Sequence, residues 1–175
     1  MQPKVRVKHL CFRLAYHAAK VYWRILKPKT YGVKVVLTQG SGPEAKVLLV
    51  QHSYGAKNSW NLPGGGYKPE KEAPEAAARR ELREELGFPV AALVEIGSYH
   101  TQAQGKRDTV TIYQSVVSWG EPDIAPASPE IESVRWVTIR DIREKTLCTA
   151  RIVREAVRML LEAEEPVEQG ARLAE

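Results

Sequence analysis

An acidic, helix-forming segment near the middle of the chain constrains its fold more than any other part of the sequence. Residues 73–86 read APEAAARRELREEL, in which most positions are good helix formers and Pro74 suits the first turn. The apolar side chains that would face a core recur every fourth residue, at Ala78, Leu82 and Leu86. Gly87 follows and suits a left-handed C-terminal cap. The pattern predicts a helix over Ala73–Leu86 that packs by one side.

Acidic side chains crowd the end of this helix, from Glu81, Glu84 and Glu85. Their spacings make them neighbours on the helix surface, and each like-charged pair costs roughly 0.2–0.5 kcal/mol. The negative end of the helix dipole costs about 0.3–1 kcal/mol more for each of the last two acids. A bound cation would reverse these penalties. The alternative is a solvated acidic face neutralised by interleaved arginines, namely Arg79, Arg80 and Arg83.

A glycine-rich turn stands directly before this helix, where residues 60–66 read WNLPGGG. The stretch predicts a short strand that runs into a turn, and its glycines allow the backbone to approach a ligand or metal closely. Such a turn is a weak phosphate signal on its own, and the acidic helix behind it strengthens the signal.

The turn and the helix together fill every fixed position of the Nudix box. The matching residues are Gly66, Glu72, Arg80, Glu81, Leu82, Glu84, Glu85, Gly87 and Phe88. The chain therefore resembles the Nudix hydrolases, which cut diphosphate linkages with a divalent metal, and no subfamily is identified. The resemblance implies an α/β fold over residues 30–164, an α/β/α sandwich with a mixed sheet.

The same resemblance implies roles for individual residues. Glu84 and Glu85 would be the main metal ligands, and Glu81 would be a third ligand or would position or deprotonate the attacking water. Arg80 would hold Glu81 through a charged hydrogen bond. The carbonyl of Gly65 would be a further ligand. Carboxylates and a carbonyl suit Mg²⁺ or Mn²⁺ rather than a soft metal.

Some members of the family place one more glutamate on a loop before a late strand that contains tryptophan. Glu130 and Glu132 precede Trp136 here, and Glu130 is the preferred candidate for an additional metal ligand or general base. A solvated loop acid is an equally good interpretation of each. Glu72 would support the start of the helix.

These residues predict Mg²⁺- or Mn²⁺-dependent hydrolysis of a diphosphate linkage in a nucleoside diphosphate derivative. Trp60 and Tyr54 are candidates to stack a base and Arg107 to meet a phosphate. Such aromatic residues are more often core or rim side chains, and Arg107 could merely be solvated. Ala103 stands where ADP-ribose enzymes carry a proline, so that subgroup marker is missing. Capped or triphosphorylated RNA is not excluded as a substrate, although the sequence holds no recognised motif for reading nucleic acid.

Two other functions stay open. A non-catalytic nucleotide sensor on the same fold usually loses box glutamates, whereas this chain keeps them all. A membrane- or partner-associated protein would use the N-terminal segment, where nine basic residues precede the first acid, Glu44; the other 17 basic residues and 21 acids leave a net charge of −4. Apolar spacing over Val5–Leu26 predicts a basic amphipathic helix within residues 1–29. It would pack on the domain or on a second subunit, lie on a membrane surface, or act as an organelle-targeting segment.

The remaining sequence predicts a compact domain, either a monomer or a homodimer. Further strands are expected at Tyr31–Thr38, Ala45–Gln51, Ala91–His100, Thr109–Ser118 and Val134–Val137, and helices at Ile139–Lys145 and Ala150–Glu164, with Thr149 as an N-cap. Residues 165–175 are expected to be a disordered tail. The sequence shows no signal peptide or bilayer-spanning apolar run, and Cys11 and Cys148 lack metal-type spacing, so a cytoplasmic location is expected.

Overall fold

The computed structural model describes residues 22, 25–54, 59–102, 106–117 and 124–164. The predicted N-terminal helix falls almost entirely outside these residues, and the predicted tail lies wholly outside them, so both stay predictions. Within the described residues, no helix is both long enough and apolar enough to cross a membrane.

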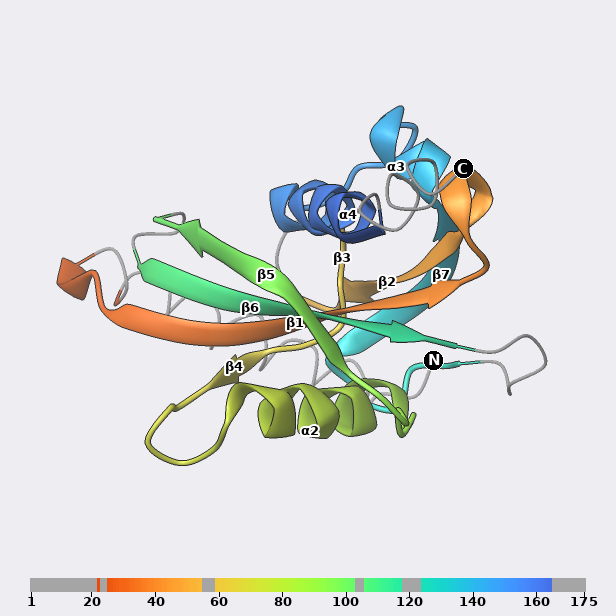
Figure 1. Cartoon of the computed structure of the whole chain (residues 1–175). Helices are drawn as coiled ribbons and strands as arrows, with labels where there is room; N and C mark the ends of the chain where they lie inside the picture. Colours follow the sequence, from red (N-terminus) through yellow and green to blue (C-terminus); the bar gives the residue numbers. More distant parts are fainter. Residues whose placement is uncertain (1–21, 23–24, 55–58, 103–105, 118–123, 165–175) are drawn as a thin grey trace, which may run out of the picture.

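A mixed sheet of seven strands lies at the centre of the described residues (Figure 1). Its strands are β1 (Lys29–Gln39), β2 (Lys46–His52), β3 (Trp60–Asn61), β4 (Gly66–Tyr67), β5 (Val94–Thr101), β6 (Arg107–Val116) and β7 (Ile131–Thr138). The main path is β3-β2-β1-β6-β5, while β4 pairs with β1 and β7 pairs with β2. β1 and β6 run parallel and the other pairs run antiparallel, so the expected mixed sheet is confirmed.

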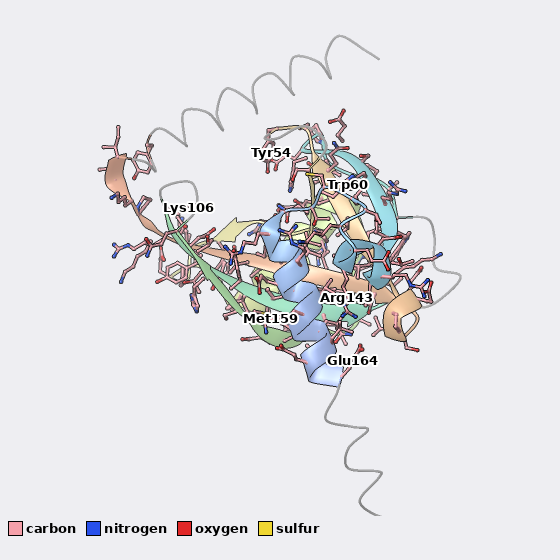
Figure 2. All side chains as sticks on the ribbon, turned by 90° about the horizontal axis from the view of Figure 1, so that it is seen from above. Tyr54, Trp60, Lys106, Arg143, Met159 and Glu164 are labelled. Atoms are coloured by element: carbon pink, nitrogen blue, oxygen red, sulfur yellow. The ribbon has the colours of Figure 1, made fainter. Side chains whose placement is uncertain are left out.

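The helices cover the two faces of this sheet, as Figure 1 shows. They are the 3₁₀ turn η1 (Gly42–Glu44), α2 (Pro74–Leu86), α3 (Ile139–Arg143) and α4 (Arg151–Glu164). Successive side chains of a strand point to opposite faces. Val33 and Val35 of β1 accordingly pack in the core cluster that includes α2, whereas Val36 packs in the cluster that includes α4. Figure 2 shows α4 lying across the sheet when it is seen from above.

Helix α2 forms where the sequence predicts it. Pro74 takes its first turn, and Gly87 closes it with a left-handed φ of 63° and an N–H that donates to the Arg83 carbonyl. Its buried apolar residues are Ala77, Ala78, Leu82 and Leu86, which confirms the predicted apolar side. Glu85 lies on the same helix and is also buried, so α2 buries a carboxyl group together with its apolar side chains.

Several element boundaries differ from the sequence prediction by one to three residues, including those at the starts of β5, β7 and α4. β5 begins at Val94 rather than at Ala91. β7 is longer than predicted because it pairs with β2 from Ile131 to Thr138, so the expectation that Glu132 lies on a loop is wrong; Glu132 is exposed within the strand, beside an irregularity in the register. α4 begins one residue late, at Arg151, since Thr149 instead forms an isolated bridge with Trp60.

Packing between α2 and the sheet is testable at Leu82, which is fully buried among Val33, Val35 and their neighbours. Leu82→Ala is expected to lower the free energy of unfolding by about 2–5 kcal/mol, because it removes buried methyl groups and leaves a cavity. Val116→Ala is the matched control, since Val116 is 70% exposed, and it should cost no more than about 1 kcal/mol. Urea unfolding of both variants measures the difference, and equal losses would contradict the packing.

Candidate active site

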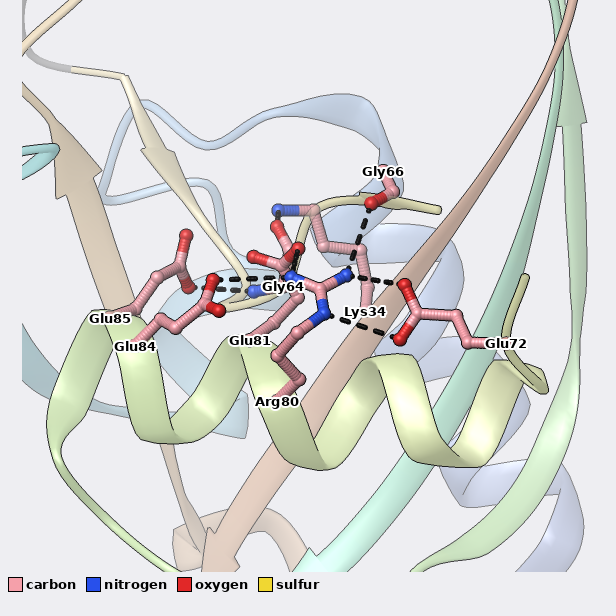
Figure 3. Close-up of polar contacts among 8 residues, drawn as sticks. All are labelled: Lys34, Gly64, Gly66, Glu72, Arg80, Glu81, Glu84 and Glu85. Carbon is pink, nitrogen blue, oxygen red and sulfur yellow. Dashed lines mark hydrogen bonds and ion pairs between the residues drawn. The ribbon is translucent and has the colours of Figure 1, made fainter. Parts of the chain in front are cut away.

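The glycine-rich turn is attached to the edge of β1. Val33 N–H donates to the Gly65 carbonyl at 2.9 Å, and Val35 N–H donates to the Pro63 carbonyl at 3.0 Å. β4 then continues the pairing, with Gly66 opposite Gly32. The first half of β1 is therefore bordered by the turn, and the end of α2 lies against that turn (Figure 3).

Two glycines allow the turn to lie this close. Gly64 has a φ of 120°, and a Cβ there would lie 2.4 Å from the Val33 carbonyl oxygen. A Cβ on Gly65 would lie 2.6 to 2.8 Å from the three carboxyl atoms of Glu81. At Gly64 a side chain would collide with backbone, so glycine is required there; at Gly65 a side chain would displace the Glu81 carboxyl group from its present position.

Arg80 connects three of the box acids, Glu72, Glu81 and Glu84. Its guanidinium contacts Glu72 at 2.8 and 3.2 Å, Glu81 at 2.7 Å and Glu84 at 3.1 Å. It also reaches the Gly66 carbonyl at 3.4 Å. The hydrogen bonds with Glu72 contribute most to raising the pKa of Arg80, and the same contact lowers the pKa of Glu72. Figure 3 shows the guanidinium placed between these carboxylates.

Glu85 points away from this network and into the protein. It is 5% exposed, and its Oε2 accepts a hydrogen bond of 2.8 Å from Gly64 N–H. Burial raises the pKa of Glu85 to about 7, and the charges of Glu81 and Glu130 add to the rise. Lys34 and the Gly64 hydrogen bond act in the opposite direction. The side chain is thus held in place but is costly to ionise without a cation nearby.

Lys34 of β1 brings a positive charge to the same turn. Its Nζ donates to the Leu62 carbonyl at 2.8 Å and to the Gly64 carbonyl. Burial lowers the pKa of Lys34, whereas the charges of Glu85 and Glu81 raise it. Lys34 is not among the residues that the sequence predicts for the site. The signal for it is a single cation inside the apolar strand sequence VKVVL, between buried valines.

Glu130 approaches the acidic cluster from the segment before β7. Its carbonyl accepts from Ser53 N–H at 2.8 Å, which attaches this segment to the end of β2. Burial raises the pKa of the Glu130 carboxyl, with further contributions from Glu81 and Glu84, while a hydrogen bond from Tyr54 lowers it. The residue preferred from the sequence, Glu130, therefore lies within electrostatic reach of Glu81 and Glu84.

The two candidates for base stacking have different surroundings. Tyr54 stacks on His52, with ring centroids 5.0 Å apart, and hydrogen-bonds Glu130. Burial, and then the charge of Lys34, lower the pKa of His52 to about 3, so this imidazole is neutral beside the acids. Trp60 packs against the core cluster on the α4 side.

Arg107 lies on a different part of the sheet. It begins β6, is exposed, and lines a cleft of about 380 Å³ together with Tyr31 and His100. Its neighbour Lys106 and Trp60 lie on opposite sides of α4 in Figure 2. Arg107 is thus placed at a cleft, but it is not part of the Arg80 network.

The predicted ligand atoms are the carboxylate oxygens of Glu81, Glu84 and Glu85 and the carbonyl oxygen of Gly65. Their chemistry fits a hard divalent cation. Their present partners are internal: Arg80 holds Glu81 and Glu84, Gly64 N–H holds Glu85, and Val33 N–H holds the Gly65 carbonyl. Across the described part of the chain, no three acidic, histidine or cysteine side chains already converge on one ion position. A cation would therefore have to draw carboxylates from Arg80, and Glu84, with a side chain 58% exposed, is the freest to turn.

The raised pKa of Glu85 predicts that the stability of the metal-free protein depends on pH. Between the ordinary value of 4.5 and about 7, the folded state keeps a proton that the unfolded state has lost. The contribution of Glu85 to the free energy of unfolding therefore falls as pH rises through this window, by at most about 3 kcal/mol, and levels off above it. His52, whose pKa burial lowers to about 3, contributes in the opposite direction up to its ordinary value of 6.5. The contribution of Glu85 is therefore the difference between the pH profiles of the wild type and Glu85→Gln, which is expected to lack it, in urea unfolding with a chelator present. Glu75→Gln, an exposed change on the same helix, should keep it, and an unchanged slope in Glu85→Gln contradicts the assignment.

The contact between the turn and α2 predicts different responses at two adjacent glycines. Gly65→Ala is expected to lower the free energy of unfolding by about 1–3 kcal/mol, because the new Cβ overlaps the Glu81 carboxyl group. Gly66→Ala should change it by no more than about 0.5 kcal/mol. The nearest atom to that Cβ, the Tyr31 carbonyl oxygen, is 3.7 Å away. Thermal or urea unfolding distinguishes them, and equal losses would mean that the turn does not lie against Glu81.

Several known proteins are similar to this chain in sequence or in fold. The chain is 37% identical over 79 residues to an octanoyltransferase of Myxococcus xanthus, a match that covers 45% of this chain and 22% of that protein. It is 27% identical over 115 residues to phosphatase NudJ of Escherichia coli K12, which covers 66% of this chain and 74% of NudJ. This chain thus spans about a fifth of the length of the first relative.

The fold is similar to that of the NUDIX domain of Shewanella oneidensis NrtR, solved in complex with ADP ribose. The TM-score is 0.62 at 21% sequence identity, and the match covers 79% of this chain and 90% of that chain. The family model described as the NUDIX domain matches residues 28–156, which contain the sheet, α2 and the glycine-rich turn. On this match over most of its length, the chain belongs to the Nudix hydrolase family.

Proposed function

We propose that this Nudix hydrolase uses Mg²⁺ or Mn²⁺ to cleave a diphosphate linkage in a nucleoside diphosphate derivative. The observation that carries the proposal is the clustering of the box acids around the turn. Arg80 gathers Glu81 and Glu84, while Gly64 N–H fixes Glu85. A solvated acidic face would not need a buried carboxylate held by a backbone N–H, so this arrangement favours a site over a surface.

The residues that would hold the cation are Glu81, Glu84, Glu85 and the Gly65 carbonyl. When bound, the ion would neutralise diphosphate oxygens and promote ionisation of a water molecule. Arg80 orients Glu81 and also binds Glu72, which precedes α2, through charge-assisted hydrogen bonds. Glu85 is aimed by Gly64, and binding a cation favours its ionised form.

Glu130 is the proposed general base or additional ligand. A carboxyl group with a raised pKa is a better proton acceptor near neutral pH than an ordinary one. Burial and the charges of Glu81 and Glu84 supply that rise, and Tyr54 limits it through its hydrogen bond. Among the substrate-binding candidates, Tyr54 and Trp60 would contact the base and Arg107 a phosphate. The ADP ribose bound in the NrtR domain supports a nucleotide as the substrate class.

A substrate panel tests the proposal. ADP-ribose, nucleoside triphosphates, dinucleoside polyphosphates, nucleotide sugars and 5′-triphosphorylated RNA are incubated with Mg²⁺ or Mn²⁺, and phosphate or nucleotide release is measured. Glu85→Gln is expected to lose about 100-fold or more of the turnover, since ligand loss removes several kcal/mol of charge stabilisation. Glu75→Gln, on the same helix and paired with Arg79, should stay within about threefold of the wild type.

Two results would overturn parts of this proposal. Near-normal turnover by metal-bound Glu85→Gln would remove Glu85 from the catalytic set. No turnover by the wild-type chain on any substrate, together with metal-dependent nucleotide binding, would instead identify a non-catalytic nucleotide sensor on this fold.

A further inference from the structure

Lys34 is a half-buried lysine on a strand whose neighbouring residues are buried, so the cost of removing its charge from water must be at least partly compensated. Lys34 lies between Val33 and Val35, both fully buried, on the strand that borders the turn. Transfer of an ammonium group out of water costs several kcal/mol, so its partners show what the charge is for.

The partners of Lys34 belong to the active-site turn. Its ammonium group donates to the carbonyls of Leu62 and Gly64, two of the residues that lead into the Nudix box. Gly64 is at the same time the residue whose N–H holds Glu85. One peptide segment is therefore held from two sides, by a lysine through its carbonyl and by a glutamate through its N–H.

The charge of Lys34 also acts on the acids themselves. It opposes the rise in the pKa of Glu85, and both Glu85 and Glu81 act in return on Lys34. An ammonium group has three N–H donors, and two are used by the carbonyls. Within the part of the chain that the structure describes, no residue accepts the third. In its protonated form, which the charges of Glu85 and Glu81 favour, Lys34 is held by two carbonyl oxygens and has one donor left for a ligand.

We propose that Lys34 is a built-in cation of the diphosphate site, which supplies part of the positive charge around Glu81 and Glu85 and donates its remaining N–H to the diphosphate of the substrate. The inference rests on the proposed function, because it concerns the same ligand. It assigns to this chain a binding residue that lies outside the box, on a strand that passes beside it.

This role has two consequences of opposite sign. A fixed positive charge close to Glu81 and Glu85 repels a divalent ion, so its removal should strengthen metal binding. The same charge attracts a diphosphate, so its removal should weaken binding of that anion. A lysine that only supported the turn would give a different result, since loosening the turn would weaken both.

The experiment uses Lys34→Met, which keeps much of the aliphatic length without the charge, and Lys34→Arg, which keeps the charge. Isothermal titration calorimetry measures Mn²⁺ binding to the full chain, and then inorganic pyrophosphate binding to the Mn²⁺-loaded protein. Lys34→Met is expected to bind Mn²⁺ about three- to tenfold more tightly and pyrophosphate about three- to tenfold more weakly. Lys34→Arg should stay closer to the wild type in both. Lys145→Met, an exposed change after α3, is the control for loss of any lysine.

Every outcome decides the matter. Urea unfolding checks that Lys34→Met is folded, which is expected because apolar replacement of a buried ion is often neutral or stabilising. If the wild type binds Mn²⁺ and Lys34→Met binds it no more tightly, or binds pyrophosphate no more weakly, the role of Lys34 is wrong while the hydrolase proposal stands. A Lys34→Met chain that does not fold shows that the lysine is structural and overturns the role as well. If the wild type binds no Mn²⁺ and releases no product from the substrate panel, the proposed function is wrong, and this inference is wrong as well.

Discussion

The structure around the site depends on holding like charges together at the C-terminal end of one helix. Glu81, Glu84 and Glu85 repel one another and also face the negative end of the α2 dipole. Three different groups offset this cost: Arg80 binds Glu81 and Glu84, Gly64 N–H binds the buried Glu85, and Lys34 adds a charge from β1. Each compensating group comes from a different element, so the acids can lie together only when α2, the turn and β1 are all in place.

The apolar packing of the domain serves this arrangement. α2 packs its small and branched residues against β1, and the parallel pairing of β1 with β6 places that strand in the interior of the sheet. A buried strand cannot shift easily, so the carbonyls and N–H groups on its edge form a rigid support for the turn. The two glycines that allow contact, Gly64 and Gly65, then set how closely the support approaches Glu81 and Glu85. Side-chain chemistry in the box is thus positioned by backbone geometry outside it.

Local features could be predicted from the sequence, and features that depend on distant pairing could not. The period and caps of α2 are properties of a single segment, and the structure reproduces them from Pro74 to Gly87. The length of β7 depends on its partner β2, about 80 to 90 residues earlier, so the position of Glu132 could not be derived from its own neighbourhood. Lys34 could not be predicted as a site residue for a related reason. It is one of nine basic residues before Glu44, and its role depends on contacts with carbonyls 28 and 30 positions further along the chain. The network that Arg80 makes with Glu72 and Glu81, in contrast, lies within the box.

A competition between internal and external cations follows from these contacts. Arg80 has bidentate contact with Glu72, so it stays anchored on that side when Glu81 or Glu84 turns to another partner. Among the described residues no arginine binds Glu85, whose hydrogen bond from Gly64 N–H uses Oε2. If the proposed function holds, Glu85 would hold a divalent ion where burial makes the gain from a nearby charge largest, and the more exposed acids would turn to that ion from Arg80. Arg80 would then be a replaceable counter-ion, whereas the turn, held by β1 and Lys34, would have to be in place beforehand.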